Sequence, residues 1–399
     1  MPARRAAGLG HRRRAGQPGA ATRDPGTCGA RRAAVTPPFH ADHVGSLLRP
    51  ARLREAFRAQ EGARTTHVEF GSVTDEAIRD VVALQESVGL QPITDGEFRR
   101  SSYWAHFVEA VDGLSTAPAL FEFTDAEGER MAFHAPHIVG RLRRARPISA
   151  AEFTFLRKVT TRTPKVTMPA PSTMHFWRGP QAFEPDAYDT IGEFFADLGA
   201  VYRAEIAELA GLGATYLQLD EVALAMLCDA DVRAAVTHRG EDPDVLVDRY
   251  VAAIRDAITG RPEGVTVSMH LCRGNYKGRW MAVGGYEPVA ERVFGRAGVD
   301  ALFLEYDSPR AGDFTPLRYV AADTAVVLGL VSSKDPKLES RDELLRRIEE
   351  ATRYVPVERL GLSPQCGFAS TVAGNPVTED DEKRKLALVV DVAEEVWGR

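Results

Sequence analysis

The chain has 399 residues, of which 44% are hydrophobic and 27% charged, a balance typical of globular proteins. It contains 34 glycines and four cysteines, which excludes collagen-like and disulfide-rich proteins. No apolar run approaches the roughly 18–20 residues that a membrane-spanning helix needs, so no membrane partner is expected. A chain of this length forms one large barrel or two modest domains.

The charge is distributed unevenly. Residues 1–36 contain eight Arg and one acidic residue, a charge of +7, which leaves −13 for the rest of a chain whose net charge is −6. An acidic body argues against nucleic acid as a partner, because phosphate contacts need clustered Lys and Arg. The basic segment is rich in Gly, Ala and Pro and lacks the apolar core of a secretory signal. We therefore predict a disordered leader over 1–36 and a single domain over 37–399.

The four cysteines are Cys28 in the leader and Cys228, Cys272 and Cys366 in the body. Their wide spacing shows no disulfide framework. The simplest interpretation is a reducing, cytoplasmic location, which leaves the thiolates free to bind a metal.

Short apolar runs alternate with helical patterns from Phe39 onward. Eight strands are predicted, at Phe39–Val44, Gln91–Thr94, Lys165–Pro169, Thr215–Leu219, Val265–Met269, Ala301–Leu304, Ala325–Leu330 and Arg359–Leu362. Helices are predicted over Thr74–Val88, Ile191–Ala210 and Asp244–Ile258, from a capping box at Ser340 to Ala351, and from Thr378 to about Trp397. This alternation predicts an α/β fold, a (β/α)8 TIM barrel. A doubly wound sheet is the alternative, but it gathers its chemistry at one switch point, whereas polar residues here follow nearly every strand.

One segment, about 112–150, interrupts the alternation after the second strand. Short alternating runs on either side of Asp125–Gly128 predict a β-hairpin excursion. It could serve as a lid, as a partner surface or simply as a surface insertion.

The run VTVSMHLCRGN places His270 and Cys272 two residues apart at a strand end, so both point to the same side. Taken alone, this pair is more readily interpreted as a buried His beside a buried Cys than as a metal site. Glu305 ends the next strand and Cys366 follows the eighth, and the strand ends of a barrel meet at one mouth. These are all zinc ligand types, and their origin on three strand ends favours a catalytic zinc site.

The charge of such a site suggests its chemistry. Two thiolates and one carboxylate around Zn²⁺ leave a net charge near −1, so the ion activates water poorly. It can still bind an incoming thiol and lower its pKa. We therefore expect alkyl transfer to sulfur.

Other strand ends supply groups for recognition. Asp95 and Glu97 follow the second strand and Asp220 the fourth, where we expect them to hold a cation such as an ammonium group. Gly45 and Ser46 follow the first strand and could hold a carboxylate, or form a plain turn.

The ordered motifs HVGS, DGEF, PAPSTMHFW, QLDE, MHLC, LEYD and PQCG resemble those of the cobalamin-independent methionine synthase family. The chain resembles the stand-alone form of its C-terminal catalytic barrel, from about Phe39 to the C-terminus. The resemblance implies a zinc-dependent (β/α)8 barrel that methylates homocysteine with 5-methyltetrahydrofolate.

The resemblance also implies site residues. It places the zinc ligands at His270, Cys272, Glu305 and Cys366, the homocysteine contacts at Val44, Gly45, Ser46, Glu97 and Asp220, and an aromatic contact of the methyl donor at Trp177. Two departures bear on the donor. The resemblance covers one barrel where the full-length synthase has two, and Ser332, Ser333 and Lys334 stand where the family has a proton-donating His. Lys334 is a candidate proton donor, and a methylcorrinoid protein is an alternative methyl donor.

Two other functions stay open from the sequence. Related single barrels resemble epoxyalkane:coenzyme M transferases, which need a cation for a sulfonate; Arg99, Arg100 and His43 are the candidates. A barrel with a structural zinc, binding a partner through 112–150, is the other. Acidic residues lining the thiol pocket indicate an amino acid substrate, and an Arg lining it indicates a sulfonate.

Overall fold

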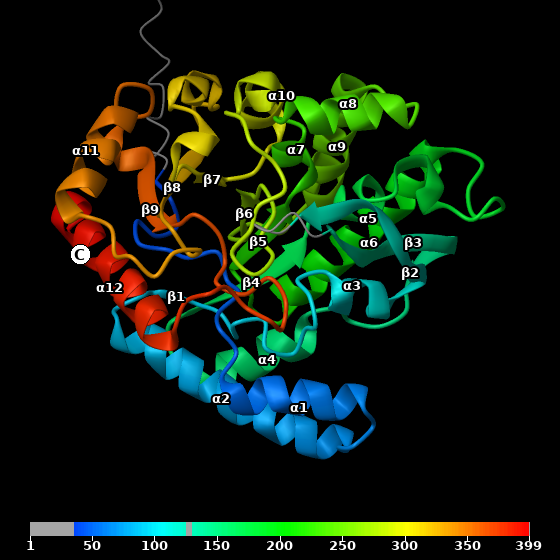
Figure 1. Cartoon of the computed structure of the whole chain (residues 1–399), viewed down its shortest axis with the longest axis horizontal. Helices are drawn as coiled ribbons and strands as arrows, with labels where there is room; N and C mark the ends of the chain where they lie inside the picture. Colours follow the sequence, from blue (N-terminus) through cyan, green and yellow to red (C-terminus); the bar gives the residue numbers. More distant parts are fainter. Residues whose placement is uncertain (1–35, 125–129, 399) are drawn as a thin grey trace, which may run out of the picture. The chain divides into compact units, whose positions relative to one another are not determined.

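The structure is a computed structural model that describes residues 36–124 and 130–398. The predicted leader over 1–36 lies outside the described residues, except for Thr36. Seven parallel strands form one sheet in the order β1-β4-β5-β6-β7-β8-β9 (Figure 1). They span Pro92–Ile93 (β1), Thr163–Pro169 (β4), Tyr216–Glu221 (β5), Thr266–Leu271 (β6), Ala301–Glu305 (β7), Ala325–Val331 (β8) and Leu360–Pro364 (β9). Their near-complete burial is typical of parallel strands covered on both faces.

The predicted first strand, Phe39–Val44, is not a regular strand. A single parallel bridge joins Ala41 to Leu362 of β9, where Asp42 N–H donates to the Leu362 carbonyl over 3.0 Å. On the other side, Thr94 Oγ1 donates to the Gly45 carbonyl over 2.6 Å. The segment thus occupies the eighth position between β9 and β1, and the barrel prediction is confirmed. The prediction of a regular strand here was wrong. The chain turns at Gly45 (φ +135°), and the hydrogen bond from the Thr94 side chain takes the place of backbone hydrogen bonds to β1.

An ion pair inside the barrel fixes this segment. Lys165 Nζ of β4 lies 3.0 Å from Asp42 Oδ1, and both side chains are fully buried. Lys165 also donates to the His43 carbonyl, and Tyr216 Oη donates to Asp42 Oδ2 over 2.6 Å. Because a buried charge is tolerated only when paired and hydrogen-bonded, these contacts hold residues 42–43 against β4 and β5.

Helices surround the sheet (Figure 1). The α-helices span Ala51–Glu61 (α1), His67–Ser87 (α2), Ala105–Ala110 (α3), Ala150–Val159 (α4), Thr173–Phe176 (α5), Ile191–Gly211 (α6), Ala223–Met226 (α7), Ala230–His238 (α8), Pro243–Ile258 (α9), Glu287–Arg296 (α10), Arg341–Ala351 (α11) and Glu379–Trp397 (α12). Short 3-10 helices span Gly179–Ala182 (η1), Pro309–Ala311 (η2), Thr315–Tyr319 (η3) and Val357–Arg359 (η4). Among the described residues, no helix is both long enough and apolar enough to cross a membrane.

Capping explains where the predicted helices begin. Helix α2 starts seven residues before the predicted Thr74, because Thr66 and Glu69 form a capping box. Thr378 caps α12 as predicted, with Asp381 as its partner. The predicted capping box at Ser340 does not form, since its side chain makes no capping hydrogen bond, although α11 begins at the next residue.

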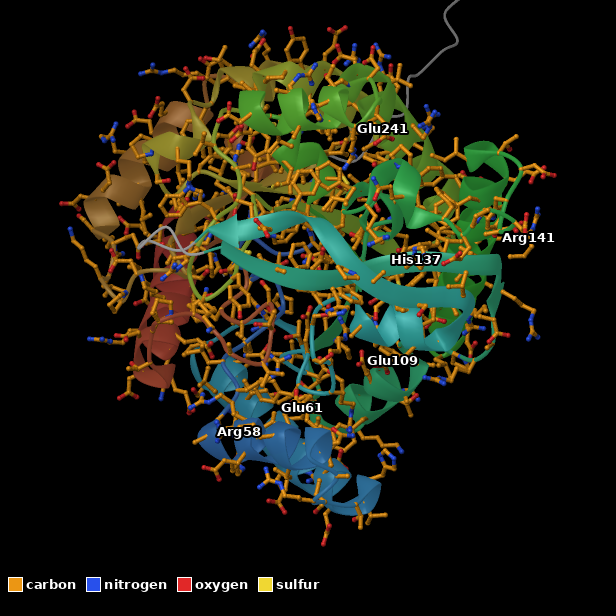
Figure 2. The ribbon with its side chains drawn as sticks, turned by 45° about the vertical axis from the view of Figure 1, so that its right-hand side comes forward. Arg58, Glu61, Glu109, His137, Arg141 and Glu241 are labelled. Carbon is orange, nitrogen blue, oxygen red and sulfur yellow. The ribbon has the colours of Figure 1, made fainter. Side chains whose placement is uncertain are left out.

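The predicted hairpin is present. Strands β2 (Val111–Thr124) and β3 (Arg130–Arg144) pair antiparallel, and the turn residues 125–129 lie outside the described residues. Figure 2 shows the hairpin in front of the barrel, with His137 and Arg141 on β3. Arg141 forms ion pairs with Glu193 and Asp197 of α6, so β3 is attached to the helical layer. This attachment leaves the hairpin beside the barrel mouth.

Candidate active site

A cavity of about 160 Å³ lies where the strands and their following loops end. Its walls bring together side chains from the barrel strands, the loops after them and the hairpin. They include Val44, Ser46, Glu97, Trp177, Asp220, His270, Cys272 and Cys366, which were predicted from the sequence, and Tyr103, Trp104, Phe133, His134, Asn275 and Tyr276, which were not. The carboxyl ends of barrel strands are the usual place for catalytic groups.

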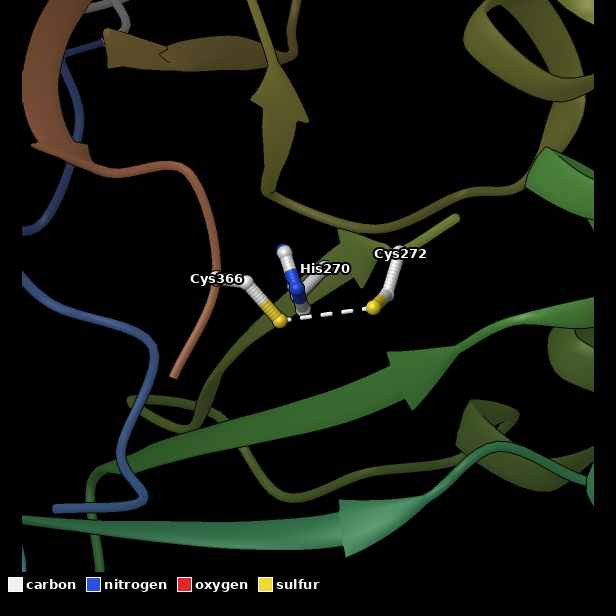
Figure 3. A group of neighbouring side chains, drawn as sticks. All are labelled: His270, Cys272 and Cys366. Atoms are coloured by element: carbon white, nitrogen blue, oxygen red, sulfur yellow. Dashed lines mark hydrogen bonds between the residues drawn. The ribbon is translucent and has the colours of Figure 1, made fainter. Parts of the chain in front are cut away.

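Three potential metal ligands meet in this cavity wall. His270 and Cys272 lie at the end of β6, and Cys366 follows β9 (Figure 3). Their ligand atoms all lie within 4.8 Å of one another, and the two Sγ atoms are 3.3 Å apart. The three residues are buried, and neither nitrogen of His270 has a hydrogen-bond partner among the described residues. An unpaired buried imidazole beside two thiols is a donor set that suits zinc.

The electrostatics of this group favour a bound cation. The pKa of Cys366 lies well below the ordinary thiol value, because Cys272 donates a hydrogen bond to it and His270 lies beside it, and these effects outweigh burial. The same hydrogen bond, together with burial, raises the pKa of Cys272. Burial lowers the pKa of His270, but Cys366, Asp220 and Glu305 outweigh it and raise the pKa overall. Negative charge is therefore concentrated on Cys366, where a metal ion would be attracted.

Glu305, the predicted fourth ligand, lies beside this group but outside the set within 4.8 Å. Its Oε2 accepts hydrogen bonds from the Arg273 backbone N–H (3.1 Å) and Nη1 (3.3 Å). Its Oε1 has no hydrogen-bond partner and lies 3.9 Å from Lys334 Nζ. The carboxylate is fully buried. Ligation by Glu305 stays a prediction.

Lys334 is not among the residues that line the cavity. Its Nζ donates to the Gly274 carbonyl over 3.2 Å and faces Glu305 rather than the cavity. Its role as a proton donor stays a prediction without support from this geometry.

Two carboxylates line the cavity beside the metal-ligand group. Glu97 Oε1 accepts from Thr167 Oγ1 (2.7 Å), whereas its Oε2 has no hydrogen-bond partner among the described residues. Asp220 Oδ1 accepts from Gln218 Nε2 over 2.7 Å. Burial raises the pKa of Glu97, and burial followed by the charge of Glu97 raises the pKa of Asp220 to about 7. A cation between them would stabilise both charged forms.

The candidate sulfonate-binding residues do not line this cavity. Arg100 is paired with Glu152 at 2.6 Å and also donates to Thr167, while Arg99 is paired with Asp75. His43 is buried outside the cavity wall. No Lys or Arg occurs among the described residues that line the cavity. The geometry therefore favours recognition of an ammonium group over a sulfonate.

Two glycines shape the wall. Gly45 does not itself line the cavity, but its φ of +135° lets Val44 and Ser46 do so, and a Cβ there would lie 2.6 Å from Thr167 Cγ2. A Cβ at Gly367 would lie 1.9 Å from Ser46 Oγ, so this glycine allows the hydroxyl to approach the loop that carries Cys366.

Aromatic rings form another part of the wall. Trp177 follows α5 and is buried, and its ring meets Phe133 of β3 edge-on at 5.2 Å between centroids. Trp104 lines the same cavity. Phe133 and His134 were not predicted from the sequence, because a hairpin has no strand end that marks the barrel mouth. For Tyr103 and Trp104, the one signal in the sequence was their proximity to the DGEF motif.

The fold and the site together define an α/β-barrel enzyme whose reactive groups lie at the carboxyl ends of its strands. More specifically, the chain belongs to the cobalamin-independent synthase family, whose catalytic-domain model matches residues 39–395. It is accordingly a methyltransferase of this type.

Similar proteins agree with this assignment. The chain is 38% identical to YxjH of Bacillus subtilis over 369 residues, 90% of this chain and 95% of that protein. It is 25% identical to the 5-methyltetrahydropteroyltriglutamate–homocysteine methyltransferase of Rhodococcus jostii, covering 82% of this chain but 40% of that protein. A solved structure from Listeria monocytogenes, described as a vitamin-B12-independent methionine synthase, has 31% identity and a TM-score of 0.71, covering 91% and 99% of the two chains. The match is thus to the stand-alone catalytic barrel.

Proposed function

We propose that this chain methylates homocysteine to methionine and that a zinc ion activates the thiol. The observation that carries the proposal is that His270, Cys272 and Cys366 share one cavity with Glu97 and Asp220. A metal-binding group and a cation-binding group on one wall suit a substrate that has both a thiol and an ammonium group.

His270, Cys272 and Cys366 would hold the ion, with Glu305 as an exchangeable fourth ligand. Bound there, zinc would lower the pKa of the substrate thiol, so that a thiolate is present near neutral pH. All four side chains are buried, and the lower dielectric of a buried site strengthens the attraction between charges. Arg273 would hold the Glu305 carboxylate whenever it leaves the ion, through the two hydrogen bonds already present.

Glu97 and Asp220 would hold the ammonium group of homocysteine. Burial raises the pKa of both carboxyl groups, and a bound cation stabilises their charged forms, so binding and deprotonation are coupled. Ser46, whose hydroxyl lies against Gly367, would hold the substrate carboxylate. The two ends of the amino acid would thereby place its sulfur at the metal-ligand group.

We propose 5-methyltetrahydrofolate as the methyl donor, bound against the aromatic wall. A pterin ring is flat, and Trp177, Phe133 and Trp104 offer apolar faces and edges for it. The name of the Rhodococcus relative supports this donor. A methylcorrinoid protein is the alternative donor that the sequence left open.

The test is methionine formation by zinc-loaded protein from homocysteine, with 5-methyltetrahydrofolate as the sole donor. We expect product that requires both protein and zinc. Absence of product from protein that holds one zinc per chain would contradict the folate donor. Repeating the assay with a methylcorrinoid protein then tests the acceptor, because failure with both donors would contradict homocysteine itself.

A further inference from the structure

The cavity contains an imidazole that the metal-ligand group does not use. His134 lies on β3 of the hairpin, lines the cavity next to Phe133, and is exposed to solvent. Its side chain forms no hydrogen bond with any residue that the structure describes. His134 and His270 are the two imidazoles among the described lining residues, and only His270 belongs to the metal-ligand group. A free imidazole at the open side of a reaction cavity is suited to exchange protons with both substrate and solvent.

The proposed reaction needs an acid. The thiolate sulfur forms a bond to the methyl carbon, the nitrogen–methyl bond breaks, and its electron pair stays on nitrogen. An amine nitrogen that leaves without a proton is a very strong base, so a proton must reach it as the bond breaks. Histidine is the side chain that most often performs this task near neutral pH.

The geometry of in-line methyl transfer indicates where in the cavity that acid must lie. The leaving nitrogen lies on the far side of the methyl group from the sulfur, hence away from the metal-ligand group. Asp220 pairs with His270 across the β5–β6 register and so lies at the sulfur end. The hairpin contributes Phe133 and His134 to the part of the wall that lies apart from the strand ends, where Phe133 packs edge-on against Trp177.

Other proton-bearing groups are less suited. Burial raises the pKa of Tyr103 well above its ordinary value, which weakens it as an acid. Lys334 does not line the cavity, and its Nζ donates a hydrogen bond to the Gly274 carbonyl.

We propose that His134 is a catalytic residue, the acid that protonates the departing nitrogen of the methyl donor. The imidazolium gives its proton to that nitrogen, and the neutral imidazole regains one from solvent at the cavity mouth. This inference rests on the proposed function, because it needs an amine donor.

The experiment compares wild-type protein with His134→Gln and His137→Gln, all zinc-loaded, using two methyl donors. 5-Methyltetrahydrofolate has a leaving nitrogen that needs a proton, whereas iodomethane has a leaving iodide that needs none. His137 lies three residues further along β3 and pairs with Glu184 outside the cavity, so it is the matched control (Figure 2). We expect His134→Gln to lose about 100-fold in the folate reaction, within the range of general acid catalysis. Its protein-dependent rate with iodomethane and its zinc content should equal those of the wild type.

The alternative outcomes are distinct. Full folate activity in His134→Gln, or an equal loss with both donors, overturns the acid role. Equal folate losses in the His134 and His137 variants also overturn it. Wild-type protein that uses iodomethane but not methylfolate overturns the folate donor and the acid role together. Wild-type protein that methylates homocysteine from neither donor overturns the proposed function itself.

Discussion

Several buried polar atoms around the cavity lack a partner. Among the described residues, neither nitrogen of His270 forms a hydrogen bond. In Glu97 and in Glu305, one carboxylate oxygen accepts a hydrogen bond and the other does not. An unpaired buried polar group costs about 1–3 kcal/mol, so these atoms indicate where ligands bind. At the residue scale, the unpaired atoms therefore lie in the metal-ligand group, on Glu97 and on Glu305.

Replacing Cys366 with Ser should abolish zinc binding and methyl transfer together, because the hydroxyl is a far weaker ligand than the thiolate. Zinc per chain after dialysis, measured by atomic absorption, is the test. Cys228→Ala is the control, since that buried thiol bonds the Leu224 carbonyl outside the cavity. A Cys366→Ser protein that kept zinc and activity would disprove the ligand assignment.

Replacing Asp220 with Asn should raise the KM for homocysteine by about 10-fold or more while zinc content stays at one per chain. A hydrogen bond to a charged group contributes about 1.5–3 kcal/mol, which corresponds to this range. The matched comparison is 4-mercaptobutyrate, which is homocysteine without its amino group. Its KM should not change in the variant. Equal losses for both thiols would mean that Asp220 does not contact the ammonium group.

At the element scale, segment 39–48 occupies the position of a barrel strand but forms few backbone hydrogen bonds with its neighbours. Its inner part is fixed by the Asp42–Lys165 pair, and its outer end is fixed by α12, since the Leu48 N–H donates to Glu382 Oε2 over 2.8 Å. Glu382 lies in the first turn of α12 and is buried. Helix α12 thus secures the segment that carries Val44 and Ser46 into the cavity.

This contact predicts a pH-dependent stability. Burial raises the pKa of Glu382 from its ordinary 4.5 to about 8 in the folded chain. The folded state therefore retains a proton that the unfolded chain has lost, and the free energy of unfolding falls as pH rises from about 4.5 to about 8. The loss should be on the order of a few kcal/mol. Urea unfolding of wild type and Glu382→Gln across this range is the measurement. The variant keeps an acceptor for Leu48 N–H and should show a smaller slope, and an unchanged slope would exclude Glu382 as its source.

At the scale of the whole barrel, the metal-ligand group joins strands that are not neighbours. His270 belongs to β6, Cys272 directly follows β6 and Cys366 follows β9, with β7 and β8 between them. A ligand that binds only the folded arrangement stabilises it by mass action.

Zinc should therefore raise the melting temperature, and a chelator should lower it again. At a free zinc concentration about 100 times the dissociation constant, the gain is about 2.7 kcal/mol. Differential scanning calorimetry with and without zinc is the measurement, and Cys366→Ser should show no shift. An equal zinc effect in that variant would indicate binding elsewhere.

Local sequence determined most of the strands, because a buried parallel strand is a short apolar run bounded by turns. The predicted Ala301–Leu304 differs from β7 by one residue, and Lys165–Pro169 begins two residues inside β4. The convergence of His270, Cys272 and Cys366 was also predictable, since strand ends of a barrel share one mouth.

Tertiary structure decided the features that depend on contacts between residues far apart in the sequence. The segment Phe39–Val44 became irregular because its partners are side chains of distant strands, such as Lys165 and Thr94. A long side chain can reach several partners, and Lys334 contacts the Gly274 carbonyl and Glu305 without lining the cavity. His134 lines the cavity only because the hairpin packs beside the barrel mouth. The local sequence of an insertion does not predict where the insertion packs.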